Sequence, residues 1–149
     1  MSDNQIVANF YNLAFEFCRY LRENEIVRES VDYLISMVMK LYVLALDLPS
    51  IEPETENNSG DMTPIHIRIN KDLPDVYWQI FNPFNDEESV CGSLTDDLSD
   101  ISRDLQIGIH EYNSGRLGNA VFEWRLGLDH HWGKHAVGLI QALHAIRTD

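Results

Sequence analysis

Two histidines near the carboxyl end of the chain, His131 and His135, have a spacing that could support chemistry. Residues four apart on a helix project from the same face, so the two imidazoles could bind one ion or share polar partners. Zinc proteases use this spacing with a glutamate directly after the first histidine, and here Trp132 stands in that place. The pair therefore predicts a polar site but names no reaction.

The histidines lie in the second of two helices that the pattern predicts for the final third of the chain. The first helix is capped by Ser93 or Thr95 and runs through Tyr112, and Gly115 ends it. The second runs unbroken from about 117 to about 146, with His135 in the middle of its apolar face and His131 at the edge. Because the connection is short, we expect an antiparallel helical hairpin.

The register of this hairpin places carboxylates opposite the histidines. In a hairpin that turns near Gly115, the numbers of facing residues sum to about twice that position. Three polar pairs then face each other across the hairpin, namely Asp97 with His135, Asp100 with His131, and Asp104 with Arg125. These six residues form the candidate cluster.

Three explanations of this cluster stay open. Buried polar groups need partners, so the aspartates could simply hold the imidazoles and the guanidinium. Alternatively, the protein is a metal-dependent, hydrolase-like enzyme, because imidazole and carboxylate are ligands for zinc, manganese and iron. The metal ligands would then be His131, His135, Asp97 and Asp100. In the third explanation, aspartate and histidine act as general acid and base on a small molecule, although no nucleophile motif or phosphate-binding loop names the reaction.

The rest of the chain is predicted to complete a helical bundle around the hairpin. Apolar residues recur every three or four positions from Ile6 to Leu21, after a cap at Ser2 or Asp3. A second such stripe follows Ser30 and stops at Pro49. We therefore expect a single all-α domain over 1–149, built as an antiparallel helical bundle of about five helices with a C-terminal helical hairpin.

The middle of the chain has three parts with different patterns. Residues 49–64 are rich in proline, glycine and polar residues, which predicts a mobile surface loop. Residues 65–69 alternate apolar and polar side chains, and without a convincing second strand we expect an extended segment lying across the bundle. Residues 70–83 predict a short aromatic helix that closes the core beneath the loop.

Composition limits the classes of partner. The 149 residues are 44% hydrophobic and 23% charged, as in an ordinary globular domain. The net charge of −13, from 24 acidic and 11 basic residues, argues against binding nucleic acid or an anionic membrane, both of which attract basic surfaces. Without a secretory signal, a membrane-spanning run or a cysteine framework, we expect a cytoplasmic protein.

Several short motifs between about Tyr77 and about Ala145 occur together, namely Tyr77-Trp78, Phe81-Asn-Pro-Phe84, Ser93-Leu-Thr-Asp-Asp97-Leu-Ser-Asp100-Ile101, Asp104-Leu105, Trp124-Arg125, His131-Trp-Gly133, His135-Ala136 and Ala142-Leu-His144. In this combination the chain resembles a bacterial family known as domain of unknown function 5063. The resemblance implies a helical fold in which the Asp-rich and His-Trp-Gly helices belong together, and it implies no activity, substrate or cofactor. The family usually has tyrosine, lysine and arginine where this chain has Ser102, Gln106 and Gln141.

The sequence therefore leaves two hypotheses about the function of this protein. The first is a binding or interaction module for an unknown protein or small molecule, which could form a homodimer through the aromatic helix or through residues 65–69. The second is the metal-dependent enzyme described above.

Overall fold

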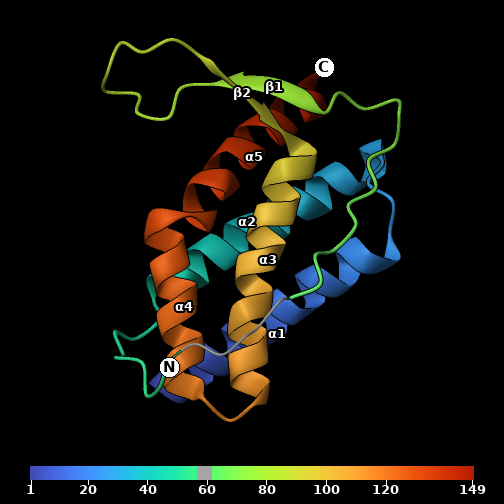
Figure 1. Ribbon diagram of the computed structural model, residues 1–149. Coiled ribbons are helices and arrows are strands. Elements are labelled where there is room, and N and C mark those ends of the chain that lie inside the picture. Colours follow the sequence, from blue (N-terminus) through green and yellow to red (C-terminus); the bar gives the residue numbers. More distant parts are fainter. Residues whose placement is uncertain (57–61) are drawn as a thin grey trace.

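The computed structural model describes residues 1–56 and 62–149, and the centre of the predicted loop, 57–61, lies outside the described residues. The described residues contain five α-helices, a short 3-10 turn and one two-stranded sheet (Figure 1). In chain order the elements are α1 (Asp3–Glu23), η1 (Arg28–Ser30), α2 (Val31–Leu46), β1 (Val76–Gln79), β2 (Val90–Ser93), α3 (Leu94–Asn113), α4 (Leu117–His130) and α5 (Trp132–Thr148). The predicted helical bundle of about five helices is confirmed, but the protein is not purely α-helical.

The helices α1 and α2 form where the apolar stripes predict them. The Ser2 hydroxyl caps α1 by accepting a hydrogen bond from the backbone N–H of Gln5 at 3.3 Å. Helix α2 follows the η1 turn and ends at Leu46, three residues before Pro49. Both helices cross behind the layer formed by α3, α4 and α5 (Figure 1).

Two tryptophans close the core between these helices. Trp124 and Trp132 are fully buried, and the Trp124 ring lies 4.8 Å from the ring of Phe10 on α1, measured between centroids. Each indole N–H donates to a backbone carbonyl, that of Trp124 to Leu105 at 3.2 Å and that of Trp132 to Trp124 at 2.9 Å. These bonds satisfy the polar edges of both rings, so their large apolar surfaces can be buried without an unpaired donor.

The predicted unbroken last helix is wrong, because the chain bends at His131. This residue has φ −146° and ψ −79°, far from helical values, and it separates α4 from α5. At the bend the backbone of Gly133 packs against the carbonyl of Leu128 so closely that a Cβ atom would overlap it. Only glycine fits there without a shift, and the bend turns the imidazole of His131 out of the helical register that the wheel assumed.

The predicted short helix within 70–83 is also wrong, and with it the expectation that no sheet forms. Residues 76–79 form β1, which pairs antiparallel with β2 so that Tyr77 faces Gly92 and Trp78 faces Cys91. The hairpin lies across the end of the bundle, over the start of α3 and beside α5 (Figure 1). Of its aromatic residues Tyr77 packs against the core, but Trp78 is 69% exposed and Phe84 is 95% exposed.

The extended segment 65–69 is confirmed. Ile65 and Ile67 are buried whereas His66 and Arg68 are exposed, as the alternation predicts. Ile69 makes an isolated parallel bridge to Ile26, so the segment lies against the end of α1 without joining a sheet. Within residues 1–56 and 62–149, every helix is too short or too polar to span a bilayer.

Candidate functional site

The site lies between α3 and the start of α5. Helix α3 begins at Leu94, directly after its cap Ser93, whose hydroxyl accepts from the backbone N–H of Asp96 at 3.0 Å. From this start, three aspartates at intervals of three and four residues fall on one side of the helix, namely Asp97, Asp100 and Asp104. The facing histidines come from α5 and from the bend before it.

His135 is held between two carboxylates. Its Nδ1 lies 2.8 Å from Asp97 Oδ1, and its Nε2 lies 3.3 Å from Asp100 Oδ2. The Asp97 residue is buried, at 2% exposure, whereas the Asp100 side chain is 34% exposed. The hydrogen bond to Asp97 raises the pKa of His135 above its ordinary value, although partial burial acts in the opposite direction.

Tyr77 completes the partners of Asp97, and the sequence reasoning missed it. Its hydroxyl donates to Asp97 Oδ2, so both carboxylate oxygens of Asp97 are used. Burial raises the pKa of Tyr77 well above its ordinary value, and the bond to Asp97 raises it further. The tyrosine fits because Gly138 on α5 has no side chain, since a Cβ there would lie 2.8 Å from the hydroxyl oxygen.

His131 has a carboxylate partner of its own. Its Nδ1 lies 2.8 Å from Asp104 Oδ2, and its side chain is 41% exposed. The two histidine rings lie next to each other, with centroids 4.9 Å apart and planes at 77°. A hollow of ≈ 210 Å³ borders His131 on its outer side and is lined by residues that include Asp104, Gly127 and His130.

The hairpin register was correct for one of its three pairs. Asp97 contacts His135 as predicted, but His131 bonds to Asp104 and not to Asp100. Asp104 does not pair with Arg125, whose guanidinium donates to the backbone carbonyl of Leu48. The bend at His131 explains the shift, because it breaks the constant register on which the pairing rule depends.

Five of the six predicted residues therefore gather at one place, and Arg125 bonds elsewhere. Ligand atoms of Asp100, His131 and His135 all lie within 4.8 Å of one another, the separation expected of groups that could share one metal ion. Nδ1 of each histidine contacts Asp97 or Asp104, so a shared metal would bind Nε2, which in His135 lies 3.3 Å from Asp100 Oδ2. Imidazoles that bind metals are oriented in the same way, with a carboxylate on the opposite ring nitrogen.

Comparison with known proteins agrees with the fold. The crystal structure of protein BF1032 from Bacteroides fragilis, a structural-genomics target, is similar with a TM-score of 0.69 and 21% sequence identity, over 97% of this chain and 96% of that chain. At this identity the likeness shows the fold alone. No curated protein matches the sequence. The family model described as "Domain of unknown function (DUF5063)" matches residues 2–149, and the chain belongs to that family.

Proposed function

We propose that this protein binds one divalent transition metal through Asp100, His131 and His135. The observation that carries the proposal is the pair of carboxylate–imidazole contacts, Asp97 with His135 and Asp104 with His131. Each contact favours a proton on Nδ1, and in the neutral imidazole this tautomer leaves the lone pair of Nε2 for a metal. Asp100 Oδ2 lies 3.3 Å from Nε2 of His135, so a carboxylate oxygen stands beside the ring nitrogen that would bind the metal.

The ligand set suits zinc, iron or manganese. Two imidazoles and one carboxylate are the protein ligands of many catalytic zinc sites and of non-haem iron sites, which keep a coordination position open. Asp97, a metal ligand in the sequence hypothesis, is here assigned to hold His135, because His135 and Tyr77 occupy its two oxygens.

The open position gives the site its chemistry. A metal with three protein ligands lowers the pKa of a bound water and supplies hydroxide near neutral pH, which is how such centres hydrolyse substrates. The exposed fractions of His131 and Asp100, 41% and 34%, leave the proposed site accessible to solvent and to a small substrate. A metal-dependent, hydrolase-like activity is therefore the function that the geometry favours.

Metal titration of the purified chain tests this proposal. The protein is freed of metal with a chelator and titrated with zinc, manganese or anaerobic ferrous iron in a calorimeter. We expect one ion bound per chain, and a melting temperature that rises with metal concentration because the ion binds the folded state. A chain that takes up no metal at one-to-one stoichiometry would contradict the proposal.

Two variants locate the site. Asp100→Asn and His131→Gln each remove one proposed ligand, and both should weaken binding by at least tenfold. His144→Gln is the matched control, because His144 is an exposed histidine farther along α5. Equal losses in all three variants would show that the metal binds the surface nonspecifically.

A further inference from the structure

The β1–β2 hairpin exposes an unusual concentration of apolar side chains. Six residues, here called the hairpin patch, are each exposed by 36% to 95%, namely Val76, Trp78, Ile80, Phe81, Phe84 and Val90. An aromatic side chain buries about 150–250 Å² when it is covered, so covering the three aromatic residues alone would remove several hundred Å² from water. Apolar patches of this size on a protein surface generally mark interaction sites.

Part of the patch lies on a face of β1 that the fold does not use. Along β1 the side chains alternate, with Tyr77 and Gln79 half-buried and Val76 and Trp78 exposed. The inner face holds the contact of Tyr77 with Asp97, and Val90 shares this face because it pairs with Gln79. The Phe81 ring lies 5.9 Å from Nζ of Lys134 on α5, so the free outer face of the strands carries Val76 and Trp78. Within the described residues the sheet has two strands, so each strand has one edge without a strand neighbour. Such an edge can accept an extended segment of another chain by adding a strand.

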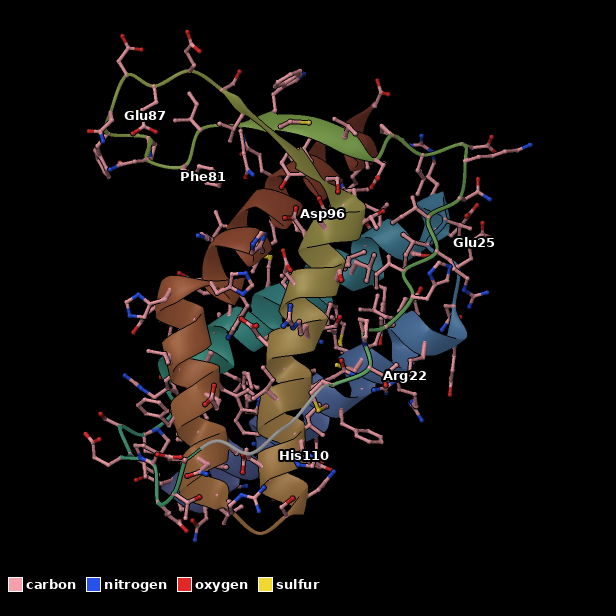
Figure 2. The ribbon with its side chains drawn as sticks, viewed as in Figure 1. Arg22, Glu25, Phe81, Glu87, Asp96 and His110 are labelled. Atoms are coloured by element: carbon pink, nitrogen blue, oxygen red, sulfur yellow. The ribbon has the colours of Figure 1, made fainter. Side chains whose placement is uncertain are left out.

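Charge around the patch selects the kind of partner. The connection between β1 and β2 carries three consecutive acidic residues, Asp86, Glu87 and Glu88, all exposed. Figure 2 shows Glu87 on the same projecting connection as Phe81. A second copy of this chain would bring two such acidic runs together, and each copy already carries a net charge of −13. The local field therefore disfavours a second copy and attracts a cationic partner.

We propose that the hairpin patch docks an extended segment of a partner protein in which lysine or arginine alternates with apolar side chains. The apolar side chains cover Trp78 and its neighbours, and the cationic ones meet the acidic run at 86–88. This inference does not depend on the metal site, because Val76 and Trp78 lie on the opposite face of β1 from Tyr77.

Binding of two synthetic peptides tests the proposal. One alternates lysine and valine over nine residues, the other alternates glutamate and valine, and both carry a fluorophore for anisotropy measurements on the whole chain. We expect saturable binding of the lysine peptide that weakens as salt is raised, and no binding of the glutamate peptide. Absence of binding by the lysine peptide, or equal binding of both, would overturn the proposal.

Variants separate the patch from the general acidity of the chain. W78S should lower the affinity for the lysine peptide by at least tenfold. The triple change of Asp86→Asn, Glu87→Gln and Glu88→Gln should lower that affinity by at least as much. Val43→Ser is the matched control, because Val43 is an exposed apolar residue on α2 outside the hairpin. A similar loss in the control would refute the assignment to the patch, with circular dichroism verifying that every variant is folded.

Sedimentation equilibrium and vesicle binding examine the other occupants. We expect a monomer at micromolar concentration and no binding to phosphatidylcholine vesicles. A dimer that W78S abolishes would show that a second copy covers the patch, and vesicle binding that W78S abolishes would show that lipid does. Either result would overturn the proposal.

Discussion

Replacing Asp97 with asparagine separates the residue that orients His135 from those that bind the metal. Asparagine has nearly the same shape, so its carbonyl oxygen can accept from the imidazole Nδ1 and its amide can donate to the Tyr77 hydroxyl. The two contacts of Asp97 can therefore persist, while the negative charge behind the imidazole is lost. The change alters the basicity of His135 without removing a metal ligand.

The size of the effect follows from the role of that carboxylate. Partners that hold a metal-binding imidazole are worth about 10–100-fold in metal affinity, which corresponds to about 1.4–2.7 kcal/mol. The free energy of unfolding of the metal-free protein should fall by only about 1–2 kcal/mol, because a charge-assisted hydrogen bond is replaced by a neutral one. Calorimetric titration with zinc and urea denaturation measure the two quantities.

The neighbouring Asp96 provides a matched control on the same turn of α3. Its side chain is exposed (Figure 2), so Asp96→Asn removes one negative charge close to the site without touching the imidazole. We expect this variant to change zinc affinity by less than threefold. If Asp97→Asn leaves the affinity unchanged, or if the two variants lose it equally, the reasoning about the oriented imidazole is wrong.

Three further predictions concern the surroundings of the site. Gly108→Ala should lower the free energy of unfolding by about 1–3 kcal/mol, because the added Cβ would overlap the buried Trp124 ring and this outweighs the better helix propensity of alanine. Equal or higher stability in urea denaturation would contradict this packing. Tyr77→Phe should weaken zinc binding less than the loss of a metal ligand does, because Tyr77 contacts only Asp97 behind His135. A zinc affinity as low as that of the ligand variants would contradict this indirect role of Tyr77. Burial raises the pKa of Cys18 to about 12, so the folded state retains that thiol's proton and the free energy of unfolding should fall as pH rises from about 9 toward 12. At pH 8 iodoacetamide should modify the exposed Cys91 and leave Cys18 intact. Modification of both thiols at similar rates in folded protein would refute the burial of Cys18.

The helices and one contact of the site could be predicted because they depend on local periodicity. Apolar spacing located α1, α2 and α3, and one of the two residues predicted for each cap, Ser2 for α1 and Ser93 for α3, is the cap in the structure. Counting back from the turn at Gly115 paired Asp97 with His135 correctly. Both inferences need only a regular helix and a short connection, which the sequence encodes directly.

The bend at His131 could not be predicted from periodicity, because the apolar stripe continues on both sides of it. The close approach of Gly133 to the Leu128 carbonyl makes the bend possible, and this is a tertiary fact that one glycine does not reveal. The bend shifts the register of the site, so that His131 contacts Asp104 and not the predicted Asp100. The mobile surface loop expected at 49–64 stays a prediction in its central part, because residues 57–61 lie outside the described residues.

The hairpin was mistaken for a helix because its aromatic residues are dense and its second strand is weak. Residues 90–93 include a cysteine, a glycine and a serine, which rarely indicate a strand. A signal was present in the composition of residues 76–80, Val-Tyr-Trp-Gln-Ile, because β-branched and aromatic residues favour strands. Recognising it would have placed Tyr77 beside Asp97, since β2 leads directly into α3.

X-ray absorption spectroscopy of the zinc-loaded chain tests the metal site most directly. The site predicts two imidazole nitrogens and at least one oxygen at about 2.0–2.2 Å from zinc, with one imidazole lost in His131→Gln and the other in His135→Gln. A spectrum with oxygen ligands alone, or one that neither substitution changes, would show that Asp100, His131 and His135 do not bind the metal and that their contacts only join the helices.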